Sequence, residues 1–258
     1  MKIVVTYKWT SNPQDAEVRP DGTVDFSRAR GAVSEYDPVA FEVARRLVDS
    51  VGGEVIGLCA GVASIDTSLA RKAALSRGLD QLVLVADQAL AGADSTRLAA
   101  VLAAAVRAIG DVDLVIAGES SMDLAEGQVA LTLAAQLGWL GLAAVAGVTA
   151  TDDDVSVERE LATGRQVLSL TGPAVLAATS DAVTPRIPGM KEILAAARKP
   201  VRVLALDALD LAAGPVSTTV LSTSRPASGN RQQVLIDGAD PEAAAADLVA
   251  ALRKVGAL

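Results

Sequence analysis

The stretch VDLVIAGESSMDLAEGQVALTLAAQLG, residues 112–138, carries the pattern that decides the fold. It opens with a short apolar run, passes through a polar run at 118–123 that holds the acids Glu119 and Asp123, and closes on a segment with an apolar helical face. A buried strand that leads through a loop into a helix is the repeating unit of α/β proteins. The polar loop between them, residues 118–128, is the first place to look for a bound ligand.

The same alternation of strand and helix extends in both directions from this stretch. Continuous apolar runs with many β-branched residues suit a parallel sheet that is covered on both faces. We therefore predict an α/β fold with a doubly wound, mostly parallel sheet of the Rossmann-like three-layer kind. The predicted strands are 2–7, 54–59, 81–86, 112–117 and 173–179, and the predicted helices are 37–52, 64–78, 94–110, 126–138 and 240–256.

Helix ends are marked by residues that favour caps and stops. Asp37 is predicted as an N-cap, with Pro38 at the first helical position. Asp94 and Asp240 are predicted to cap two later helices in the same way. Gly110 is predicted to end the helix that Asp94 begins.

Three segments depart from the alternation. Residues 16–26 read as a β-hairpin around a Pro-Asp-Gly turn, and residues 154–170 read as a second strand pair. Residues 214–232 are rich in Ser and Thr and have no clear period, which indicates an extended arm or linker. We predict an α/β domain over residues 1–210, followed by a C-terminal arm and helix over residues 211–258.

Composition excludes several classes of function. The net charge is −8 and the pI is about 4.7, so there is no basic footprint for nucleic acid. The chain has one cysteine, Cys59, and no histidine, which excludes an internal disulfide, a Cys/His zinc site and Ser-His-Asp catalysis. No apolar run reaches the roughly 20 residues of a membrane span, and the start MKIVVTYK lacks the apolar region of a signal peptide. We expect no membrane insertion and a cytoplasmic location.

Four polar loops follow predicted strands, where ligands bind in doubly wound sheets. Neither the G-x-G-x-x-G fingerprint nor a P-loop is present in them. The residues alone indicate an adenine nucleotide bound in an undetermined way, and ordinary turns are the alternative. The loops are TYKWTSNP (6–13), CAGVASID (59–66), DQALAGAD (87–94) and GESSMDLAEGQ (118–128).

Seven segments occur in an order that matches a known family and together cover roughly residues 1–210. The chain resembles the beta subunit of electron transfer flavoprotein. The matching segments are MKIVVTYK (1–8), SEYDPVAFEVARRL (34–47), ARKAALSRGLDQLVLV (70–85), LAGAD (90–94), DLVIAGESSMDLAEGQV (113–129), VERE (157–160) and TPRIPGMKEILAAARKPVRVL (184–204).

The resemblance implies an electron carrier that is not an enzyme. A family beta subunit pairs with an alpha subunit, and the heterodimer carries an FAD, held mostly by alpha, between partner dehydrogenases and an electron acceptor. The beta subunit of most members buries an AMP. Electron-bifurcating members place a second FAD there, and this alternative stays open because the Gln128-Val129 pair also occurs in them.

The resemblance also implies which residues form the nucleotide pocket. The tripeptide Glu119-Ser120-Ser121 departs from the family's more basic or amide-rich run, so this member is expected to differ there in what it binds. The residues implied are Thr6, Asp37, Ala60, Gly61, Gly118, Ser120, Ser121, Asp123, Gly127, Gln128 and Val129.

Residues 184–194 resemble the family's recognition loop, which projects an apolar anchor into a partner dehydrogenase. Met190 stands at the anchor position, with Pro185 and Arg186 before it. Glu160 is implied to lie near the flavin-bearing interface with alpha. The alternative for Met190 is that it begins an ordinary helix and packs inward.

Two other functions compete with electron transfer. The chain would bind an adenine nucleotide without any partner if it were a stand-alone sensor of similar fold. A small-molecule hydrolase is disfavoured, because histidine is absent and no acid pair lies in a recognisable catalytic loop.

Overall fold

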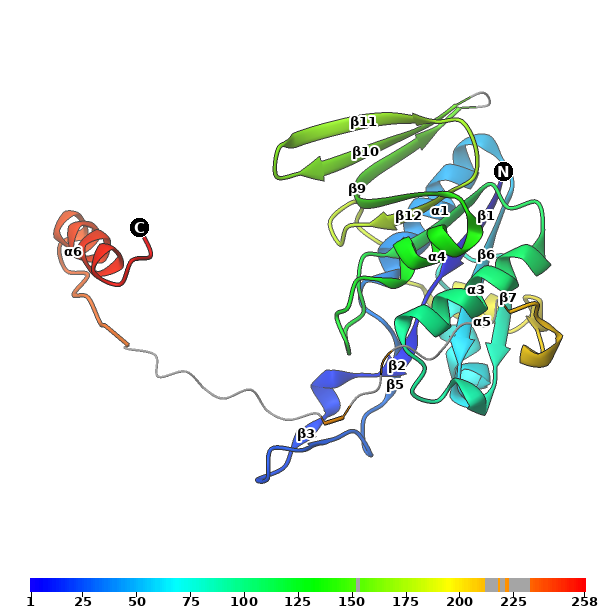
Figure 1. Cartoon of the computed structure of the whole chain (residues 1–258), viewed down its shortest axis with the longest axis horizontal. Coiled ribbons are helices and arrows are strands. Elements are labelled where there is room, and N and C mark those ends of the chain that lie inside the picture. Colours follow the sequence, from blue (N-terminus) through cyan, green and yellow to red (C-terminus); the bar gives the residue numbers. More distant parts are fainter. Residues whose placement is uncertain (152–153, 212–217, 219–220, 223–232) are drawn as a thin grey trace. The chain divides into compact units, whose positions relative to one another are not determined.

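The computed structural model describes residues 1–151, 154–211, 218, 221–222 and 233–258. The chain divides into two compact units, Met1–Thr223 and Ser224–Leu258, which are described separately below. Figure 1 shows the course of the chain through both units.

A single large sheet forms the centre of the first unit (Figure 1). Its strand order in the described residues is β11-β10-β9-β12-β8-β1-β6-β7-β13, and every pairing from β9 to β13 is parallel. Strands β10 and β11 add an antiparallel edge. The strands are β1 (Lys2–Thr6), β6 (Glu54–Gly61), β7 (Gln81–Ala86), β8 (Leu114–Gly118), β9 (Leu140–Ala150), β10 (Val155–Leu161), β11 (Gly164–Leu170), β12 (Ala174–Ala178) and β13 (Val201–Val203).

Helices cover both faces of this sheet and enclose two hydrophobic clusters. On one face, α1 (Asp37–Val51), α2 (Ser68–Leu75) and α5 (Met190–Ala196) contribute side chains to the cluster that contains Phe41 and Leu75. On the other face, α3 (Ser95–Ile109) and α4 (Val129–Leu137) contribute to the second cluster. The predicted doubly wound, three-layer α/β fold is therefore confirmed.

Two small strand pairs lie outside the sheet. The hairpin predicted at residues 16–26 is present as β3 (Glu17–Val18) and β4 (Val24–Asp25). A second pair, β2 (Trp9–Ser11) with β5 (Gly31–Val33), was not predicted. Short 3-10 helices η1 (Pro13–Asp15), η2 (Ala63–Asp66), η3 (Gln88–Leu90) and η4 (Leu206–Ala208) complete the described elements of this unit.

The helix ends correct three details of the prediction. Asp37 does not cap α1, because it is the first helical residue and its carboxylate is used elsewhere. The helix predicted at 64–78 is two pieces, η2 and α2, and Thr67 supplies the cap of α2. Helix α4 begins at Val129, three residues later than predicted, so Glu126 belongs to the preceding loop. Asp94 and Gly110 bound α3 as predicted.

The second unit contains α6 (Pro241–Lys254), where Asp240 caps the amides of Glu242 and Ala243 as predicted. The predicted linker at 214–232 lies largely outside the described residues. Among the described helices, none combines the length and the apolar character that crossing a membrane requires.

Candidate functional site

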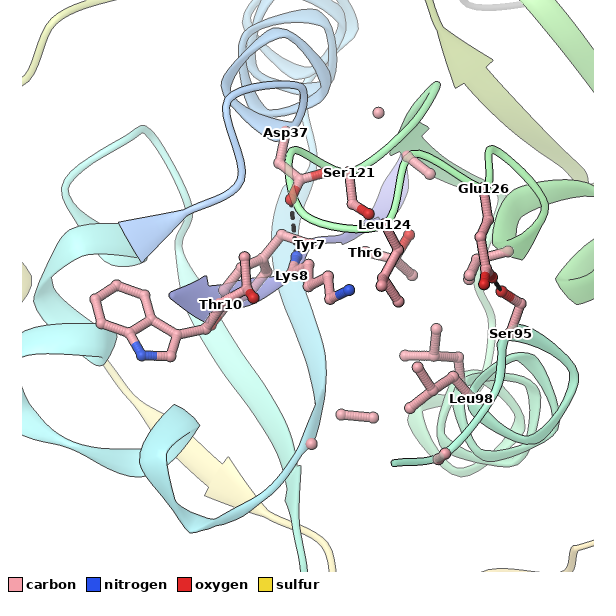
Figure 2. A pocket seen from close by; sticks show the side chains of 18 of the residues that line it. Thr6, Tyr7, Lys8, Thr10, Asp37, Ser95, Leu98, Ser121, Leu124 and Glu126 are labelled. Atoms are coloured by element: carbon pink, nitrogen blue, oxygen red, sulfur yellow. Dashed lines mark hydrogen bonds between the residues drawn. The ribbon is translucent and has the colours of Figure 1, made fainter. Parts of the chain in front are cut away.

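A cavity of about 390 Å³ opens where β1, β6 and β8 end (Figure 2). Its wall also includes the first residues of α3 and α4, so two helix N-termini border the same space. This is the crevice in which doubly wound sheets bind ligands, and the volume lies within the usual range of ligand pockets.

Most of the pocket residues implied by the sequence meet in this cavity. Strand ends supply Thr6, Ala60 and Gly61, and the start of α1 supplies Asp37. The loop from β8 to α4 supplies Gly118, Ser120, Ser121, Gly127, Gln128 and Val129. Asp123 is absent from the described lining and instead holds two residues of the opposite wall.

The N-terminus of α4 is available to a ligand. Gln128 precedes the helix without a side-chain cap, and the first amides of a helix have no partner within the helix. By contrast, the Asp94 side chain caps α3 by accepting from the Arg97 amide. Because Gln128, Val129 and Ala130 line the cavity, the uncapped amides and helix dipole of α4 favour a negatively charged group there.

Asp123 links the two sides of the cavity mouth. Its carboxylate accepts from the Lys8 ammonium at 2.7 Å and from the Thr10 hydroxyl at 2.9 Å. Burial acts to raise the pKa of Asp123, but hydrogen bonds from Lys8, Ser121 and Thr10 outweigh it and lower the pKa. The contacts join the loop 119–128 to the segment that follows β1.

Asp37 lies buried beneath the cavity, with 4% of the residue exposed. Its carboxylate accepts from the Lys8 amide at 2.7 Å (Figure 2). The Gly118 amide also donates to it. Burial raises the pKa of Asp37 to about 8, although both amides act against this shift. Asp37 therefore ties the end of β1 to the end of β8 and defines the cavity floor.

Two glycines at the cavity wall have close neighbours in the positions that a side chain would occupy. A Cβ on Gly118 would lie 2.8 Å from the Tyr36 carbonyl group and 2.9 Å from the Asp37 carboxylate. A Cβ on Gly61 would meet the Ile65 methyl group at 3.1 Å. Gly118 is therefore required by packing, whereas the neighbour of Gly61 is a movable side chain.

The charge of the lining is predominantly negative. Among the described residues that line the cavity, Lys8 is the cation, and it is paired with Asp123. Glu126 accepts a hydrogen bond from the Ser95 hydroxyl at the start of α3 (Figure 2). Glu119 accepts a hydrogen bond from the Ser180 amide at 2.9 Å. A bound anion must therefore rely on backbone amides and hydroxyl groups more than on side-chain cations.

Thiol and metal chemistry find no support at this site. Burial raises the pKa of the Cys59 thiol to about 12, so its reactive thiolate is scarce at neutral pH. Within the described part of the chain, no cluster of acids and cysteine could hold a metal ion.

The residues predicted to dock a partner lie away from the cavity lining. Met190 begins α5 but does not pack inward, because 72% of it is exposed. Arg186 follows Pro185 and forms an ion pair with Glu42 on α1. Glu160 lies on β10 and pairs with Arg165 on β11 at 2.7 Å.

Sequence reasoning missed several residues of the site. Lys8 and Thr10 lie in the loop 6–13, Glu126 lies in the loop 118–128, and Ser95 is the first residue of α3, but no motif singled them out. Lys8 offered a weak signal, as a cation directly after a buried strand. Its pairing with Asp123 spans 115 positions of sequence and depends on the fold.

The chain matches the sequence model of a known protein family. The sequence model of the electron transfer flavoprotein domain matches residues 21–209. The matched range includes β6, β8, α3 and α4, which build most of the cavity, and the segment 184–194.

Proposed function

We propose a function from the premise that this chain belongs to the electron transfer flavoprotein family, whose sequence model covers most of it. Members of this family are electron carriers rather than enzymes. We infer that this chain is the beta subunit of a heterodimeric carrier that binds AMP in its cavity and shares an FAD with an alpha subunit. The cytoplasm is its proposed location.

The uncapped N-terminus of α4 in the cavity wall is the observation that carries the AMP proposal. A phosphate group accepts hydrogen bonds from free amides at a helix start, and the helix dipole stabilises its charge. Ser120 and Ser121 line the same wall and offer hydroxyl donors. The amides of Gln128 and Val129 would hold the phosphate, and the part of the cavity lined by Ala60 and Gly61 would take the sugar and base.

A second FAD in this cavity, as in electron-bifurcating members, is the alternative. The cavity volume of about 390 Å³ is near the lower end of the range for ligand sites. This size favours a mononucleotide over a dinucleotide.

The FAD shared with the alpha subunit would supply the redox chemistry of the proposed heterodimer, and this chain would contribute to the position and surroundings of that FAD.

An exposed apolar segment supports a protein partner rather than a stand-alone sensor. Ile187 is 94% exposed, Met190 72% and Leu194 67%, all within the segment 185–194. Clustered apolar side chains of this kind mark interaction sites on proteins. We propose that this segment, with Pro185 and Arg186 at its base, docks the donor dehydrogenase, and that Glu160 lies near the alpha subunit.

Co-expression tests the proposed assembly. The chain produced with the alpha subunit of its source organism is expected to co-purify as a yellow complex in a single peak on size exclusion, with flavin absorbance following the protein. A colourless chain that binds adenine nucleotides equally well in the absence of alpha would instead indicate the stand-alone sensor.

Neutralising Asp123 is expected to strengthen AMP binding. The change Asp123→Asn leaves the Lys8 ammonium without its paired carboxylate, so the ammonium is free to attract a phosphate. We expect the affinity for AMP to rise several-fold relative to adenosine, since one partly exposed charge pair contributes about 1 kcal/mol or less. Isothermal titration of nucleotide-depleted protein with AMP and with adenosine measures both affinities.

A charge-matched control separates this effect from the overall charge of the protein. Asp25→Asn removes a carboxylate that pairs with Arg19 in the β3–β4 hairpin, outside the cavity lining. It is expected to change neither affinity. Equal changes for AMP and adenosine in Asp123→Asn would show that the phosphate does not lie near Lys8.

A further inference from the structure

A buried ionic contact holds the base of the segment 185–194 on helix α1. We propose that Glu42 is a positioning residue that fixes Arg186 and thereby sets the direction in which Ile187 and Met190 face a partner protein. The proposal rests on the docking role proposed above for this segment, and it adds the element that orders the segment before a partner arrives.

The contact between Glu42 and Arg186 is multiple. One carboxylate oxygen of Glu42 accepts from the Arg186 Nε at 2.6 Å and from the Arg186 amide at 3.3 Å. The other oxygen accepts from the Arg186 terminal nitrogen at 3.2 Å. The two side chains form a bidentate pair, which fixes their relative orientation as well as their separation. The bond to the amide also fixes the backbone directly before Ile187.

The surroundings of Glu42 make this contact stronger than a surface ion pair. Glu42 is 5% exposed, whereas the Arg186 side chain is 40% exposed. Arg46, one turn further along α1, also donates to Glu42 at 3.0 Å. Burial acts to raise the pKa of Glu42, but the hydrogen bonds from Arg186 and Arg46 outweigh it and lower the pKa. The carboxylate is therefore ionised at neutral pH. Removing Arg186 leaves this buried charge with Arg46 as its remaining arginine partner.

The segment has little else to define its conformation. From Arg186 to Ala195 no residue is buried, and Ala196 is the first side chain of α5 that reaches the core. Apolar packing therefore does not hold Ile187 or Met190 in place. A segment that is already ordered loses less conformational entropy when it binds, which increases affinity without any new contact.

Hydrogen exchange tests the positioning role without any partner. In Glu42→Gln, the amides of Arg186, Ile187 and Gly189 are expected to exchange at least tenfold faster, because the carboxylate that holds Arg186 becomes a neutral amide. Pro185 and Pro188 have no amide hydrogen and do not contribute. Arg186→Gln breaks the same contact from its exposed side and is expected to give the same result. It replaces Glu42→Gln in the test if that variant proves unstable. The measurement is amide exchange by mass spectrometry on the full chain.

Arg45→Gln is the matched control on the same helix. Arg45 is also paired, with Asp49 at 2.9 Å and Asp80 at 3.1 Å, and it contacts the carbonyl of Gly78 beyond the end of α2. Its partner Asp49 lies 4.0 Å from Arg186, at the limit of an ion pair, so Arg45→Gln leaves the contact between Glu42 and Arg186 intact. The loss of Arg45 is expected to leave exchange at residues 185–189 unchanged. Equal exchange in Glu42→Gln and wild type, or equal acceleration in Arg45→Gln, would overturn the proposal.

Electron-transfer kinetics test the consequence for docking. The probe is the dehydrogenase fraction from the source organism that reduces the flavin of the wild-type heterodimer. With this fraction, Glu42→Gln and Arg186→Gln heterodimers are expected to show a KM about tenfold higher than wild type with kcat unchanged, whereas Arg45→Gln is expected to match wild type.

The outcomes separate the two proposals. If no fraction reduces the wild-type flavin, the docking function fails, and the exchange data still decide whether Glu42 orders the segment. If wild type is reduced and Glu42→Gln has the same KM, the segment does not need this contact to dock, and the positioning role in docking is wrong. A fall in kcat alone would also overturn it.

Discussion

Replacing Gly118 by alanine is expected to lower the free energy of unfolding by about 2 kcal/mol and to leave the purified protein without bound nucleotide. The added Cβ would lie 2.8 Å from the backbone carbonyl of Tyr36 and 2.9 Å from the Asp37 carboxylate. Backbone at the start of α1 cannot rotate away as a side chain can. The end of β8 and the start of α1 must therefore separate, which displaces the cavity floor.

Gly61→Ala is the matched control for this prediction. Gly61 also ends a central strand and lines the same cavity, but its added Cβ would meet only a methyl group of Ile65 at 3.1 Å. We expect a loss of unfolding free energy below about 1 kcal/mol, because this side chain can shift. Urea unfolding and nucleotide content measure both variants. Equal behaviour of the two would contradict a specific role for close packing at Gly118.

The stability of the protein is expected to fall as the pH rises from about 4 to about 8 because of Asp37. The folded pKa of this residue is about 8, and the pKa of an unfolded Asp is about 3.9. Between these values the folded state keeps a proton that the unfolded state has released. The contribution is therefore fully present below pH about 4 and is lost as the pH rises through about 8, by up to about 1.4 kcal/mol per pH unit.

Asp37→Asn is expected to remove this pH dependence. The asparagine cannot ionise, but its amide group replaces one of the two oxygens that accept from Lys8 and Gly118. The variant should therefore be less stable than wild type at pH 5, by about 1–3 kcal/mol for a lost buried hydrogen bond. The difference should shrink as the pH rises and should reverse before pH 9, because a loss of about 1.4 kcal/mol per pH unit between pH 5 and pH 8 exceeds it.

Urea unfolding at pH 5, 7 and 9 provides the measurement. Asp25→Asn is a suitable control, because hydrogen bonds from Ser27 and then Arg19 hold the pKa of Asp25 at about 2, and its titration lies below this range. Parallel curves for wild type and Asp37→Asn would show that Asp37 is ionised in the folded protein throughout.

Most of the sheet could be predicted from the sequence because its central strands are recognisable as apolar runs. Runs such as QLVLVA (81–86) are long, apolar and bounded by polar residues, and the strand β7 has the predicted bounds. Strand β13 (Val201–Val203) has three residues, and only the register against β7 defines it. The pair β2 and β5 was missed for a similar reason, since its residues have no clear alternation.

The site was predictable as a set of loops but not as a set of contacts. Strand ends and glycines could be located from spacing, because the carboxyl ends of parallel strands meet at one edge. The use of Asp37 as a cap was wrong, since amides from two distant strand ends compete for its carboxylate. Likewise, nothing near Arg186 points to Glu42, which lies 144 positions away in the sequence.

The central claim is that the cavity holds a mononucleotide while a single flavin is shared with a partner subunit. The direct test is to denature the purified heterodimer and to count the AMP and FAD released per pair by chromatography. The account predicts one AMP and one FAD. Two FAD and no AMP would contradict it and would establish a second flavin in this cavity.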